Sequence, residues 1–532
     1  MRKALYQFGY RRSPDQDRAQ AAPHPVVVVG AGPVGLSAAV DLAQRGVPVV
    51  LLDDADRIGE GSRGICYAKR TLEILNRLGV AGRCLAKGVT WKIGKVFQGG
   101  ELLYPFDLLP EDGHAMPAFI NLQQYYLEHY LVERAGEVPG VDIRWRNRVT
   151  AVRPRNDGVT LAVDTPEGPY EIDAGWVIAA DGARSSLRAM LGLAFRGEVF
   201  EDRFLIADVK MQGDFPTERW FWFDPPFHEG RSALLHKQPD DVWRIDLQLG
   251  PEADAAAEQR PERVVPRLRQ MLGHDDFSLE WVSVYTFQCR RLERFVHGRV
   301  VFAGDAAHQV SPFGARGANS GIQDADNLAW KLALVVKGEA PEGLIDTYDA
   351  ERSAAADENI GHSTRSTDFI APRSAQELRF RDAALFLARS TDFAKRMVNS
   401  GRLSSPSTYD SPLLTPDREP WSGAARPGAP LPDAPLRDRD GRRVWLLDAV
   451  GGEETLIEVG AGAAGGHPGR RLVIGEDLID ADGFFAARFD ATPGAAYLVR
   501  PDQHLAARWR APDPEAVAAA SRRLRGLDGR AA

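Results

Sequence analysis

The feature that most constrains this chain is a short apolar run that leads directly into a glycine-rich turn. Residues 26–29 are four consecutive valines, as expected of a strand buried on both faces. The turn Gly-Ala-Gly-Pro-Val-Gly follows at 30–35, and an Ala/Leu-rich segment then runs to residue 46. A second apolar run covers 47–52. The order strand, turn, helix, strand predicts a βαβ unit in an α/β fold.

The turn has the spacing of a dinucleotide-binding loop. Gly30 permits the tight turn, Gly32 lets the backbone approach a pyrophosphate, and Gly35 brings the helix close to the strand. Pro33 lies at the start of the helix, whose first N–H groups favour phosphate. Asp53 ends the second strand, where an acid would bind a ribose hydroxyl. The loop alone does not distinguish FAD from NAD.

Composition narrows the class of protein further. The 532 residues are 44% hydrophobic and 26% charged, with a net charge of -8, which indicates a globular chain and argues against a nucleic-acid partner. Cys66, Cys84 and Cys289 are too few and too far apart for a disulfide framework or a cysteine-rich metal site. No apolar run suits a transmembrane helix or a secretory signal. We therefore expect a cytoplasmic protein with no membrane partner and no metal.

Several strand-like runs cluster in the middle of the chain, at 204–211, 219–223, 232–236, 242–247 and 281–288. They predict a sheet inserted at 201–289 that covers the substrate. A helical region follows, with Asp349, Glu351 and Arg352 on its polar side. The tail is predicted to contain strands at 444–447 and 496–499 and a terminal helix. The predicted divisions are an N-terminal extension at 1–24, a discontinuous nucleotide-binding domain at 25–200 and 290–400, a linker at 404–441 and a C-terminal domain at 442–532.

Two later motifs decide the cofactor. Asp181-Gly-Ala-Arg-Ser-Ser-Leu-Arg188 follows a predicted strand, and Gly304-Asp305-Ala-Ala-His308 follows another, with Pro312 soon after. Together with the glycine-rich loop they resemble the single-component FAD-dependent aromatic hydroxylases of the para-hydroxybenzoate and phenol hydroxylase type. The resemblance spans roughly the first 340 residues and implies a Rossmann-like FAD-binding domain with an inserted β-sheet. The tail resembles the thioredoxin-like α/β domain of phenol hydroxylases, but all three cysteines precede it.

The resemblance implies roles for individual residues. Asp305, after Gly304, would hold the ribityl chain of the flavin, and Pro312 would lie beside its ring. Gly317, Ala318 and Asn319 would begin the helix whose N-terminal amides stabilise negative charge on the reduced ring.

Other residues match the family in separate segments. Arg63 would approach the flavin, and Gln124 would contact the ribityl chain, although adjacent Gln123 leaves that register open. Asp181 and Arg188 would link the flavin domain to the path of the nicotinamide, unless Arg188 forms only a surface salt bridge. His308 is expected to be structural.

The implied chemistry uses NADH or NADPH to reduce FAD. The reduced flavin would react with O₂ to form a C4a-hydroperoxide, which would transfer oxygen to a phenolic or other electron-rich aromatic ring. Such an enzyme would serve the catabolism of aromatic compounds. A dry pocket is required, because water hastens the loss of hydrogen peroxide. Relatives also imply a homodimer.

The group that activates the phenol is left open. Some phenol hydroxylases have an aspartate near the segment of Arg63, but Ile65 occupies that position here. Tyr67, His236 and Tyr285 remain candidate bases, and each is also typical of a packed strand or loop residue.

Three arginines are candidates for the substrate or flavin. Arg316 stands where the family often has glutamine, so it would add a cation near the flavin or substrate, or point to solvent. Arg219 and Arg244 are candidates for binding a substrate carboxylate, although arginines on strands are usually solvated.

Two alternatives remain on the same fold. A flavin-dependent halogenase or reductase is one, although residues 243–247 do not supply the tryptophan-rich halogenase signature. A flavin-binding protein without turnover is the other, and substrate-stimulated NAD(P)H consumption separates it from the enzymes.

Overall fold

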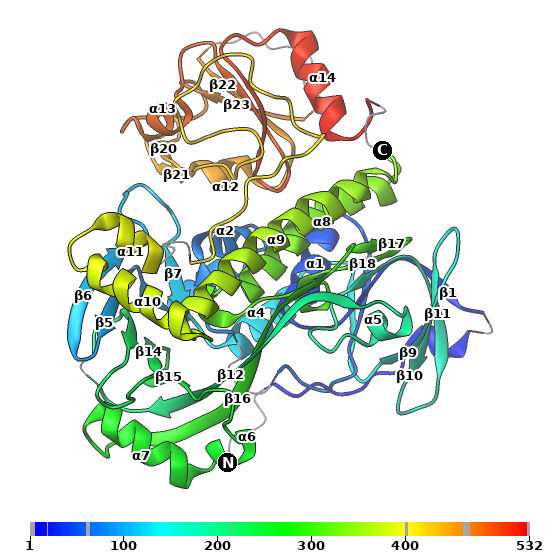
Figure 1. Cartoon of the computed structure of the whole chain (residues 1–532). Helices are drawn as coiled ribbons and strands as arrows, with labels where there is room; N and C mark the ends of the chain where they lie inside the picture. Colours follow the sequence, from blue (N-terminus) through cyan, green and yellow to red (C-terminus); the bar gives the residue numbers. More distant parts are fainter. Residues whose placement is uncertain are drawn as a thin grey trace.

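A computed structural model describes residues 6–18, 20–59, 64–213, 215–398, 403–460 and 469–528. Its first sheet is built around β1 (Ala22–Val29), which is followed by α1 (Pro33–Gln44) and β2 (Val49–Leu52). The strand order is β17-β18-β11-β1-β2-β8, and β1 pairs in parallel with β2 on one side and β11 on the other. Figure 1 labels β1, β11, β17 and β18 of this sheet. The other strands of this sheet are β8 (Val141–Arg144), β9 (Arg148–Pro154), β10 (Val159–Asp164), β11 (Tyr170–Ala179), β17 (Val296–His297) and β18 (Val300–Phe302).

The glycine-rich loop joins β1 to α1, and two of its glycines, Gly30 and Gly35, have no room for a side chain. Gly30 has a φ of +108°, and a Cβ there would lie 2.4 Å from the carbonyl oxygen of Ala180. A Cβ on Gly35 would lie 2.0 Å from the oxygen of Gly30. The valines of β1 are buried on both faces, as predicted. The predicted βαβ unit is therefore present.

A second sheet of eight strands has the order β19-β16-β12-β15-β14-β13-β5-β6. All the strand-like runs predicted between residues 201 and 289 lie in it, and it also recruits two strands from 93–107. The strands are β5 (Ile93–Gln98), β6 (Glu101–Asp107), β12 (Phe195–Lys210), β13 (Arg219–Phe223), β14 (Ser232–Lys237), β15 (Val242–Gln248), β16 (Ser278–Leu292) and β19 (His308–Gln309).

The two faces of the second sheet have different neighbours. On one face, apolar side chains such as Leu205 and Ile245 pack against Val264 and Leu268 of α7 (Pro261–Leu272). This helix lies beneath the sheet in Figure 1, near α6 (Ala255–Glu258). The alternate residues of the same strands point to the opposite face, because side chains alternate along a strand. That second face carries the charged residues of the site.

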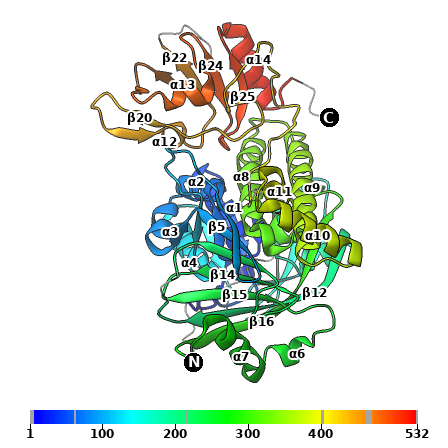
Figure 2. The same ribbon diagram turned by 60° about the vertical axis from the view of Figure 1, so that its left-hand side comes forward.

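Between the nucleotide-binding sheet and the tail lie α8 (Gly317–Val336) and α9 (Leu344–Ile370), visible side by side in Figure 2. Glu351 and Arg352, predicted to lie with Asp349 on the polar side of this region, are both buried. Asp349, only partly buried, accepts hydrogen bonds from the Phe295 amide and Arg294. The polar side of α9 is covered by α8 and by the C-terminal domain.

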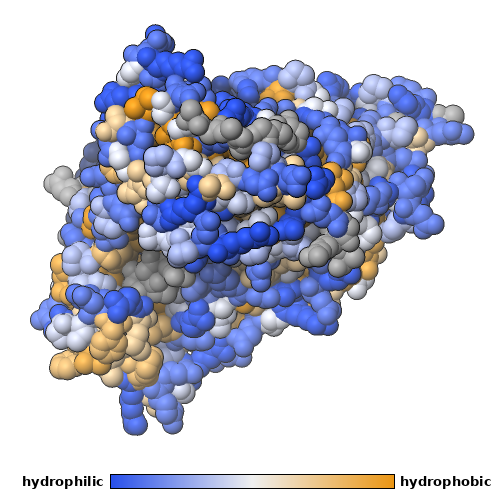
Figure 3. Space-filling model, turned by 90° about the horizontal axis from the view of Figure 1, so that it is seen from above, coloured by the Kyte–Doolittle hydropathy of each residue, from blue (hydrophilic) through white to orange (hydrophobic). Residues whose placement is uncertain are grey.

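Two further helices follow, α10 (Ala375–Ala388) and α11 (Asp392–Val398). An apolar area at the lower left of Figure 3 lies on their side of the molecule. Large apolar side chains exposed on these two helices are Leu378, Phe380, Phe386, Leu387, Phe393 and Met397.

The C-terminal domain contains a four-stranded sheet of order β23-β22-β24-β25. Residues 425–436, expected to belong to a linker, contribute Leu431 and Leu436 to its core. The predicted strand at 444–447 is cut short, because α12 begins at Leu446. Its elements are β20 (Pro435–Arg437), β21 (Arg443–Trp445), α12 (Leu446–Val450), β22 (Thr455–Val459), β23 (Arg470–Ile474), α13 (Phe484–Phe489), β24 (Ala496–Val499), β25 (Leu505–Trp509) and α14 (Pro514–Leu524).

Buried ion pairs join the C-terminal domain to α8 and α9. Arg500, next to β24, donates two hydrogen bonds of 2.9 Å to the carboxylate of Glu351 on α9. The ammonium of Lys331 on α8 lies 2.9 Å from the same carboxylate. All three side chains are fully buried, and the equally buried Asp502, paired with Arg500, supplies the second negative charge that balances the group.

A second buried group connects α9 to the loop after β18. Arg352 donates to Asp324 on α8, which in turn accepts hydrogen bonds from the Gly304 amide at 2.9 Å and from His308 at 2.7 Å. His308 is thus held inside the domain. Its contacts are those of a structural residue.

The remaining elements surround the first sheet. At the N-terminal end, Phe8 stacks on Trp145 and Asp15 pairs with Arg144. No helix in the described ranges is both long and apolar enough to cross a membrane. The elements are η1 (Pro14–Asp17), β3 (Cys66–Ala68), α2 (Lys69–Arg77), α3 (Ala81–Lys87), β4 (Val89–Trp91), β7 (Phe119–Asn121), α4 (Gln124–Glu137), α5 (Ser186–Met190), η2 (Gly304–Ala306) and η3 (Pro312–Gly314).

Candidate functional site

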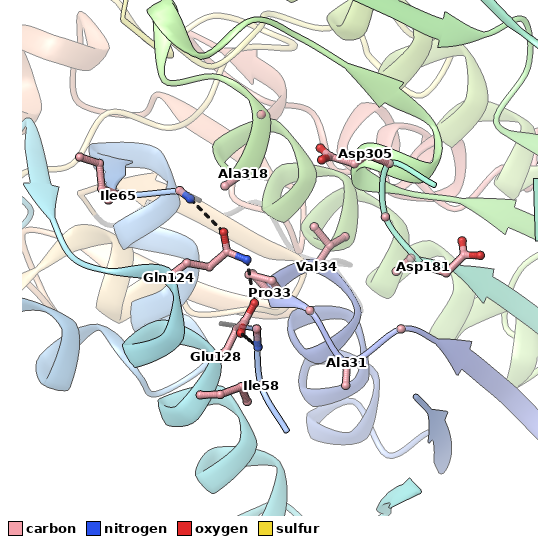
Figure 4. A pocket seen from close by; sticks show the side chains of 18 of the residues that line it. Ala31, Pro33, Val34, Ile58, Ile65, Gln124, Glu128, Asp181, Asp305 and Ala318 are labelled. Carbon is pink, nitrogen blue, oxygen red and sulfur yellow. Dashed lines mark hydrogen bonds between the residues drawn. The ribbon is translucent and has the colours of Figure 1, made fainter. Parts of the chain in front are cut away.

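A cavity of about 810 Å³ runs from the glycine-rich loop to the second sheet. One end is lined by the loop after β1 and by the end of β2, the middle by α4, by the loops after β11 and β18 and by the start of α8. The far end is lined by β12, β13, β14 and β15. Figure 4 shows the first turn of α1 in the centre, with Gln124 and Glu128 on one side and Asp181 and Asp305 on the other.

The nucleotide end is shaped by backbone atoms. Gly32 lines the cavity, and a Cβ on it would meet no atom within 4 Å, so the loop leaves open space beside its backbone. Asp53 accepts hydrogen bonds from the amides of Ala31 at 2.6 Å and Ala55 at 2.8 Å. Burial raises the pKa of Asp53. These features fit the pyrophosphate and ribose of a dinucleotide.

The middle of the cavity is bordered by a chain of hydrogen bonds on α4. The Gly64 amide donates to Gln124 at 3.0 Å, Gln124 donates to Glu128 at 2.7 Å, and Glu128 accepts from the Gly59 amide at 2.9 Å (Figure 4). Gln123 is buried elsewhere and donates to the carbonyl of Pro239. Of the two glutamines, Gln124 is therefore the one that lines the cavity. Arg63 lies outside the described residues.

Asp181 and Arg188 do not form an ion pair with each other. Asp181 lines the cavity and accepts hydrogen bonds from the Leu187 amide at 3.1 Å and from Ser186 at 3.2 Å. Arg188 instead donates to the carbonyls of Ala306 and Ala183 and lies 3.9 Å above the ring of Phe195. The arginine therefore ties α5 to the loop after β18.

The start of α8 forms the wall opposite α4. Asp305, Pro312, Gly317 and Ala318 all line the cavity, and the first amides of the helix have no partner within the helix itself. Asn319 accepts a hydrogen bond from the Ala68 amide at 2.8 Å and donates to the carbonyl of Cys66 at 2.9 Å. It thus fixes β3 against α8. Gly304, with a φ of +62°, brings the loop against Val34.

Arg316 is buried and does not point to solvent. It precedes the first residue of α8 and lines the cavity beside Pro312 and Phe313. The structure therefore excludes the solvated arrangement considered from the sequence. A cation at this place lies next to the positive end of the α8 dipole, and both favour a negative charge in the cavity.

The far wall consists of side chains from the second sheet. Pairing places Ile206, Asp246 and Leu234 in one row across β12, β15 and β14. The next row contains Asp208, Arg244 and His236. Of the candidates predicted on these strands, His236, Arg219 and Arg244 all line the cavity.

The charged side chains on this wall differ in how completely they are hydrogen-bonded. Arg244 is paired with Asp208 through hydrogen bonds of 2.9 and 3.1 Å. Arg219 donates to the carbonyl of Phe313 at 3.1 Å, and its Nε is buried with no hydrogen-bond partner in the described part of the chain. His236 is buried, and burial together with Arg219 and Arg244 holds its pKa well below the usual range.

The two tyrosines considered as bases lie outside the lining of the cavity. Tyr67 on β3 is buried in the core of the first domain, and its hydroxyl is without a partner among the described residues. Tyr285 on β16 packs with Trp281 and the aromatic cluster around Phe204. Neither is positioned with the residues of the far wall.

Asp246 was not recognised from the sequence. Its carboxyl lines the cavity, and its Oδ1 is buried with no hydrogen-bond partner among the described residues. Burial, with the neighbouring Asp208 charge, raises its pKa to about 6 despite Arg244 and Arg219. The alternation of polar and apolar residues along 242–248 is the one signal that places it on the same face as Arg244.

A smaller apolar cavity of about 60 Å³ adjoins the far end. It shares Arg219, Phe313 and Arg316 with the larger cavity, and aromatic side chains such as Phe106 and Phe221 line it. Within the described ranges, no group of three or more His, Cys, Asp or Glu is arranged to hold a metal ion.

Comparisons with known proteins agree with this geometry. The family described as "FAD binding domain" matches residues 24–363. A flavin-dependent monooxygenase of Mycobacteroides abscessus is 31% identical over 505 residues, covering 90% of this chain and 96% of that protein. A 3-(3-hydroxy-phenyl)propionate/3-hydroxycinnamic acid hydroxylase of Mycolicibacterium smegmatis is 28% identical, covering 90% of each chain.

Among solved structures, the flavin-dependent monooxygenase PieE, in complex with FAD and substrate, superimposes with a TM-score of 0.82 at 25% identity. The match covers 96% of this chain and 100% of that one. The chain therefore belongs to the FAD-binding class A flavoprotein monooxygenases, the family predicted from its three motifs. It is a flavin-dependent monooxygenase, and its cofactor is FAD.

Proposed function

We propose that the protein hydroxylates a phenolic or other electron-rich aromatic compound with O₂ and NADH or NADPH. The observation that carries this proposal is the single cavity that joins the glycine-rich loop to the charged wall of the second sheet. A cofactor site alone would fit any flavoprotein. A buried polar wall facing the start of α8 is suited to positioning a second, smaller molecule against the flavin.

The cofactor would lie along the cavity with its pyrophosphate at the glycine-rich loop and its ribityl chain in the middle. Gly30, Gly32 and Asp53 would hold the pyrophosphate and ribose, and Gln124 and Asp305 would bind the ribityl chain. Gly304 would keep the loop of Asp305 in place. When bound, FAD supplies the redox chemistry, accepting hydride from the nicotinamide and activating O₂.

The flavin ring would rest between two walls. Pro312 and the amides of Gly317, Ala318 and Asn319 lie on one side of the proposed ring position, with Arg316 adding positive charge. Asp181 would lie on the path by which the nicotinamide approaches, which is the role implied for it by the family. The second sheet would exclude water from the reacting atoms.

Arg219 would bind a negatively charged or strongly accepting group of the substrate. Its Nε has no partner among the described residues, and Ile206 and Leu234 offer apolar contacts to a ring nearby. The adjoining cavity with Phe106 and Phe221 would receive an apolar substituent or a further ring. The substrates expected are therefore phenols with an apolar or anionic extension.

The C-terminal domain is proposed to have a thioredoxin-like fold with a structural role. It contains none of the three cysteines, so dithiol chemistry is excluded. Its buried contact with α8 and α9, through Arg500 and Glu351, supports a role in holding those helices.

The test follows NAD(P)H oxidation by the FAD-loaded protein with a panel of phenols, recording product mass. The panel contains 3-(3-hydroxyphenyl)propionate, 4-nitrophenol and 2-naphthol. We expect at least one phenol to accelerate oxidation and to gain one oxygen atom. If the flavin is reduced but no compound gains oxygen, a reductase is favoured, and incorporation of halide identifies a halogenase. No acceleration by any compound favours a non-catalytic flavoprotein.

A further inference from the structure

Three polar atoms without hydrogen-bond partners gather on the far wall. They are Nε of Arg219, Nδ1 of His236 and Oδ1 of Asp246, and all three are buried. Buried polar atoms are nearly always hydrogen-bonded, because leaving one unpaired costs about 1–3 kcal/mol. Three such atoms at the end of one cavity are available to a ligand with polar groups of its own.

Some hydrogen-bonding groups on this wall are paired with each other, and others are available to a ligand. Arg244 and Asp208 form a close ion pair, so their charges largely cancel. Arg219 can only donate, whereas the Asp246 carboxylate can only accept. Arg219 and Asp246 are close enough for each charge to affect the pKa of the other, and Nε of Arg219 and Oδ1 of Asp246 both lack a hydrogen-bond partner among the described residues. The wall therefore presents a donor and a separate acceptor, which suits a substrate that carries both an accepting group and a hydroxyl.

Asp246 lies between two apolar side chains of the cavity wall. Its neighbours in the strand pairing are Ile206 on one side and Leu234 on the other, and both line the cavity. An apolar surrounding leaves the carboxylate poorly solvated, and its pKa is raised to about 6. A proton acceptor is most effective when its pKa lies near the operating pH.

The other candidate bases are less suitable. The imidazole of His236 has a pKa well below its ordinary value, so it is a weak proton acceptor. Tyr67 and Tyr285 do not line the cavity. Asp208 is already engaged by Arg244 and by Gln238. Asp246 is thus the carboxylate on this wall that faces the cavity with an unpaired oxygen.

We propose that Asp246 accepts the hydrogen bond of the substrate's phenolic hydroxyl and takes up its proton during oxygen transfer. This inference rests on the proposed function. The phenolic O–H bond breaks, the proton goes to an Asp246 carboxylate oxygen, and the bonding pair stays on the phenol oxygen. That oxygen donates electron density into the ring, which makes the ring a better nucleophile. A ring carbon then forms a C–O bond with one oxygen atom from O₂, and the other oxygen atom leaves as water with the two electrons that NAD(P)H supplies. The carboxyl returns its proton to the same oxygen when the hydroxylated carbon loses its hydrogen to solvent as a proton.

The pH dependence follows from the charges around Asp246. The ionised carboxylate is the form that accepts, so kcat/KM is expected to fall as the pH drops through about 6. Other groups keep their charge through that range, since Arg219 and Arg244 stay protonated and His236 stays neutral. The titratable and charged groups around Asp246 are Cys66 on β3, Asp208 on β12, Arg219 on β13, His236 on β14, Arg244 on β15 and Arg316 before α8.

The first test measures binding without turnover. The FAD-loaded protein is titrated by calorimetry with 2-naphthol and with 2-methoxynaphthalene, which lacks the hydroxyl. Repeating the titration in two buffers of different ionisation enthalpy counts the protons exchanged. We expect 2-naphthol to bind at least about 10-fold more tightly and to release protons between about pH 5 and pH 7, because its hydrogen bond favours the ionised carboxylate.

The matched variants are Asp246→Asn and Asp241→Asn, the second being an exposed carboxylate in the same hairpin. Asp246→Asn should release no protons and should discriminate less between the two naphthalenes, because its amide oxygen accepts a weaker hydrogen bond than a carboxylate, while Asp241→Asn should behave as the wild type. In turnover, Asp246→Asn should lower kcat/KM by about 10²–10⁴-fold and abolish the acid limb of the pH profile. The loss should be smaller with 4-nitrophenol, whose hydroxyl ionises more easily.

Each result bears on one hypothesis. Hydroxylation of any phenol by the wild type tests the proposed function, and the comparison with Asp246→Asn tests the role of Asp246. The role is wrong if Asp246→Asn keeps the acid limb, or if the wild type binds 2-naphthol no better than its methyl ether. The proton count of the wild type decides the question even if the variant does not fold.

Discussion

The two ends of the cavity recognise their ligands with different parts of the chain. At the nucleotide end, the shape comes from the backbone of three glycines. A side chain would not fit at Gly30 or Gly35, and at Gly32 it would fill open space beside the loop. At the far end, the surface is made by side chains such as Arg219 and Asp246, which project from strands of the second sheet. The first end depends on local chain geometry, and the second depends on which strands become neighbours.

This difference separates two kinds of change in the protein. A change at the nucleotide end alters the path of the chain, so it should affect folding and cofactor binding for every substrate. A change at the far end leaves the backbone in place, so it should alter which substrate is bound and at what pH it reacts. The following predictions test that separation, beginning with the largest effect.

Gly30→Ala should give the largest loss. Its φ of +108° is unfavourable for alanine, and the new Cβ would lie 2.4 Å from the Ala180 carbonyl oxygen. We expect a loss of about 4 kcal/mol in the free energy of unfolding, or a failure to accumulate folded protein. Urea denaturation measures the loss. The control is Gly136→Ala, where a Cβ meets nothing within 4 Å and stability should not fall.

Gly32→Ala should leave the fold intact and weaken FAD binding. The residue has an extended backbone with φ of -79°, and a Cβ there meets no protein atom within 4 Å. The methyl group would occupy the space proposed for the pyrophosphate, so we expect about a 100-fold loss of FAD affinity, or about 2.7 kcal/mol. Titration of the FAD-free protein measures it. Unchanged affinity would show that the pyrophosphate does not lie there.

Asp246→Asn should make the protein more stable at neutral pH. The pKa of Asp246 is raised from 3.8 to about 6, so the folded state binds more protons than the unfolded state between those values. Stability is therefore lost as the pH rises through that window, and the ionised carboxylate costs about 2–3 kcal/mol above pH 6. Urea midpoints should favour Asp246→Asn near pH 8 and coincide with the wild type near pH 4. Equal midpoints at both would show that Asp246 is well solvated.

Arg219→Gln should change substrate preference with the smallest energetic effect. We expect KM for 3-(3-hydroxyphenyl)propionate to rise about 10-fold, or about 1.4 kcal/mol, because a cation facing its carboxylate is lost. For 2-naphthol, which has no carboxylate, KM should change little. Steady-state kinetics with both compounds measure the ratio. Arg196→Gln, an exposed residue of β12, is the control and should leave both values unchanged.

The nucleotide end was predictable because its signal is local. A buried strand, three glycines and an acid at a fixed spacing define Gly30, Gly32, Gly35 and Asp53 within thirty residues of sequence. The motifs at 181–188 and 304–308 carry the same kind of signal. The structure brings all of these segments to one cavity.

The far wall was less accessible to prediction, because strand order decides it. His236 and Arg219 were candidates by residue type, but nothing in the sequence showed that β13, β14 and β15 lie side by side over the cavity. Asp246 was overlooked because a polar residue on an alternating strand is typical of a solvated face. Here that face looks into the cavity.

The same limit applies to α9. The pattern around Glu351 and Arg352 is that of a polar helix face, and the sequence does not show that another domain covers it. Partners from distant segments, Arg500 at the tail and Asp324 on α8, neutralise the two charges. The sequence pattern thus indicates a polar side of the helix and does not show that Glu351 and Arg352 are buried.

The buried ion pairs between the tail and the helices also decide how this enzyme can be rebuilt. A chimera that exchanges the C-terminal domain would remove Arg500 and Asp502 together and leave the Glu351–Lys331 pair of α9 and α8 facing the new domain. A new domain that contributes only one charge at this junction would create an uncompensated buried charge, which costs about 3–5 kcal/mol, a large part of the stability of a typical domain. The domain is therefore not an interchangeable module. A successful graft has to transfer the charges on both sides of the junction as one unit.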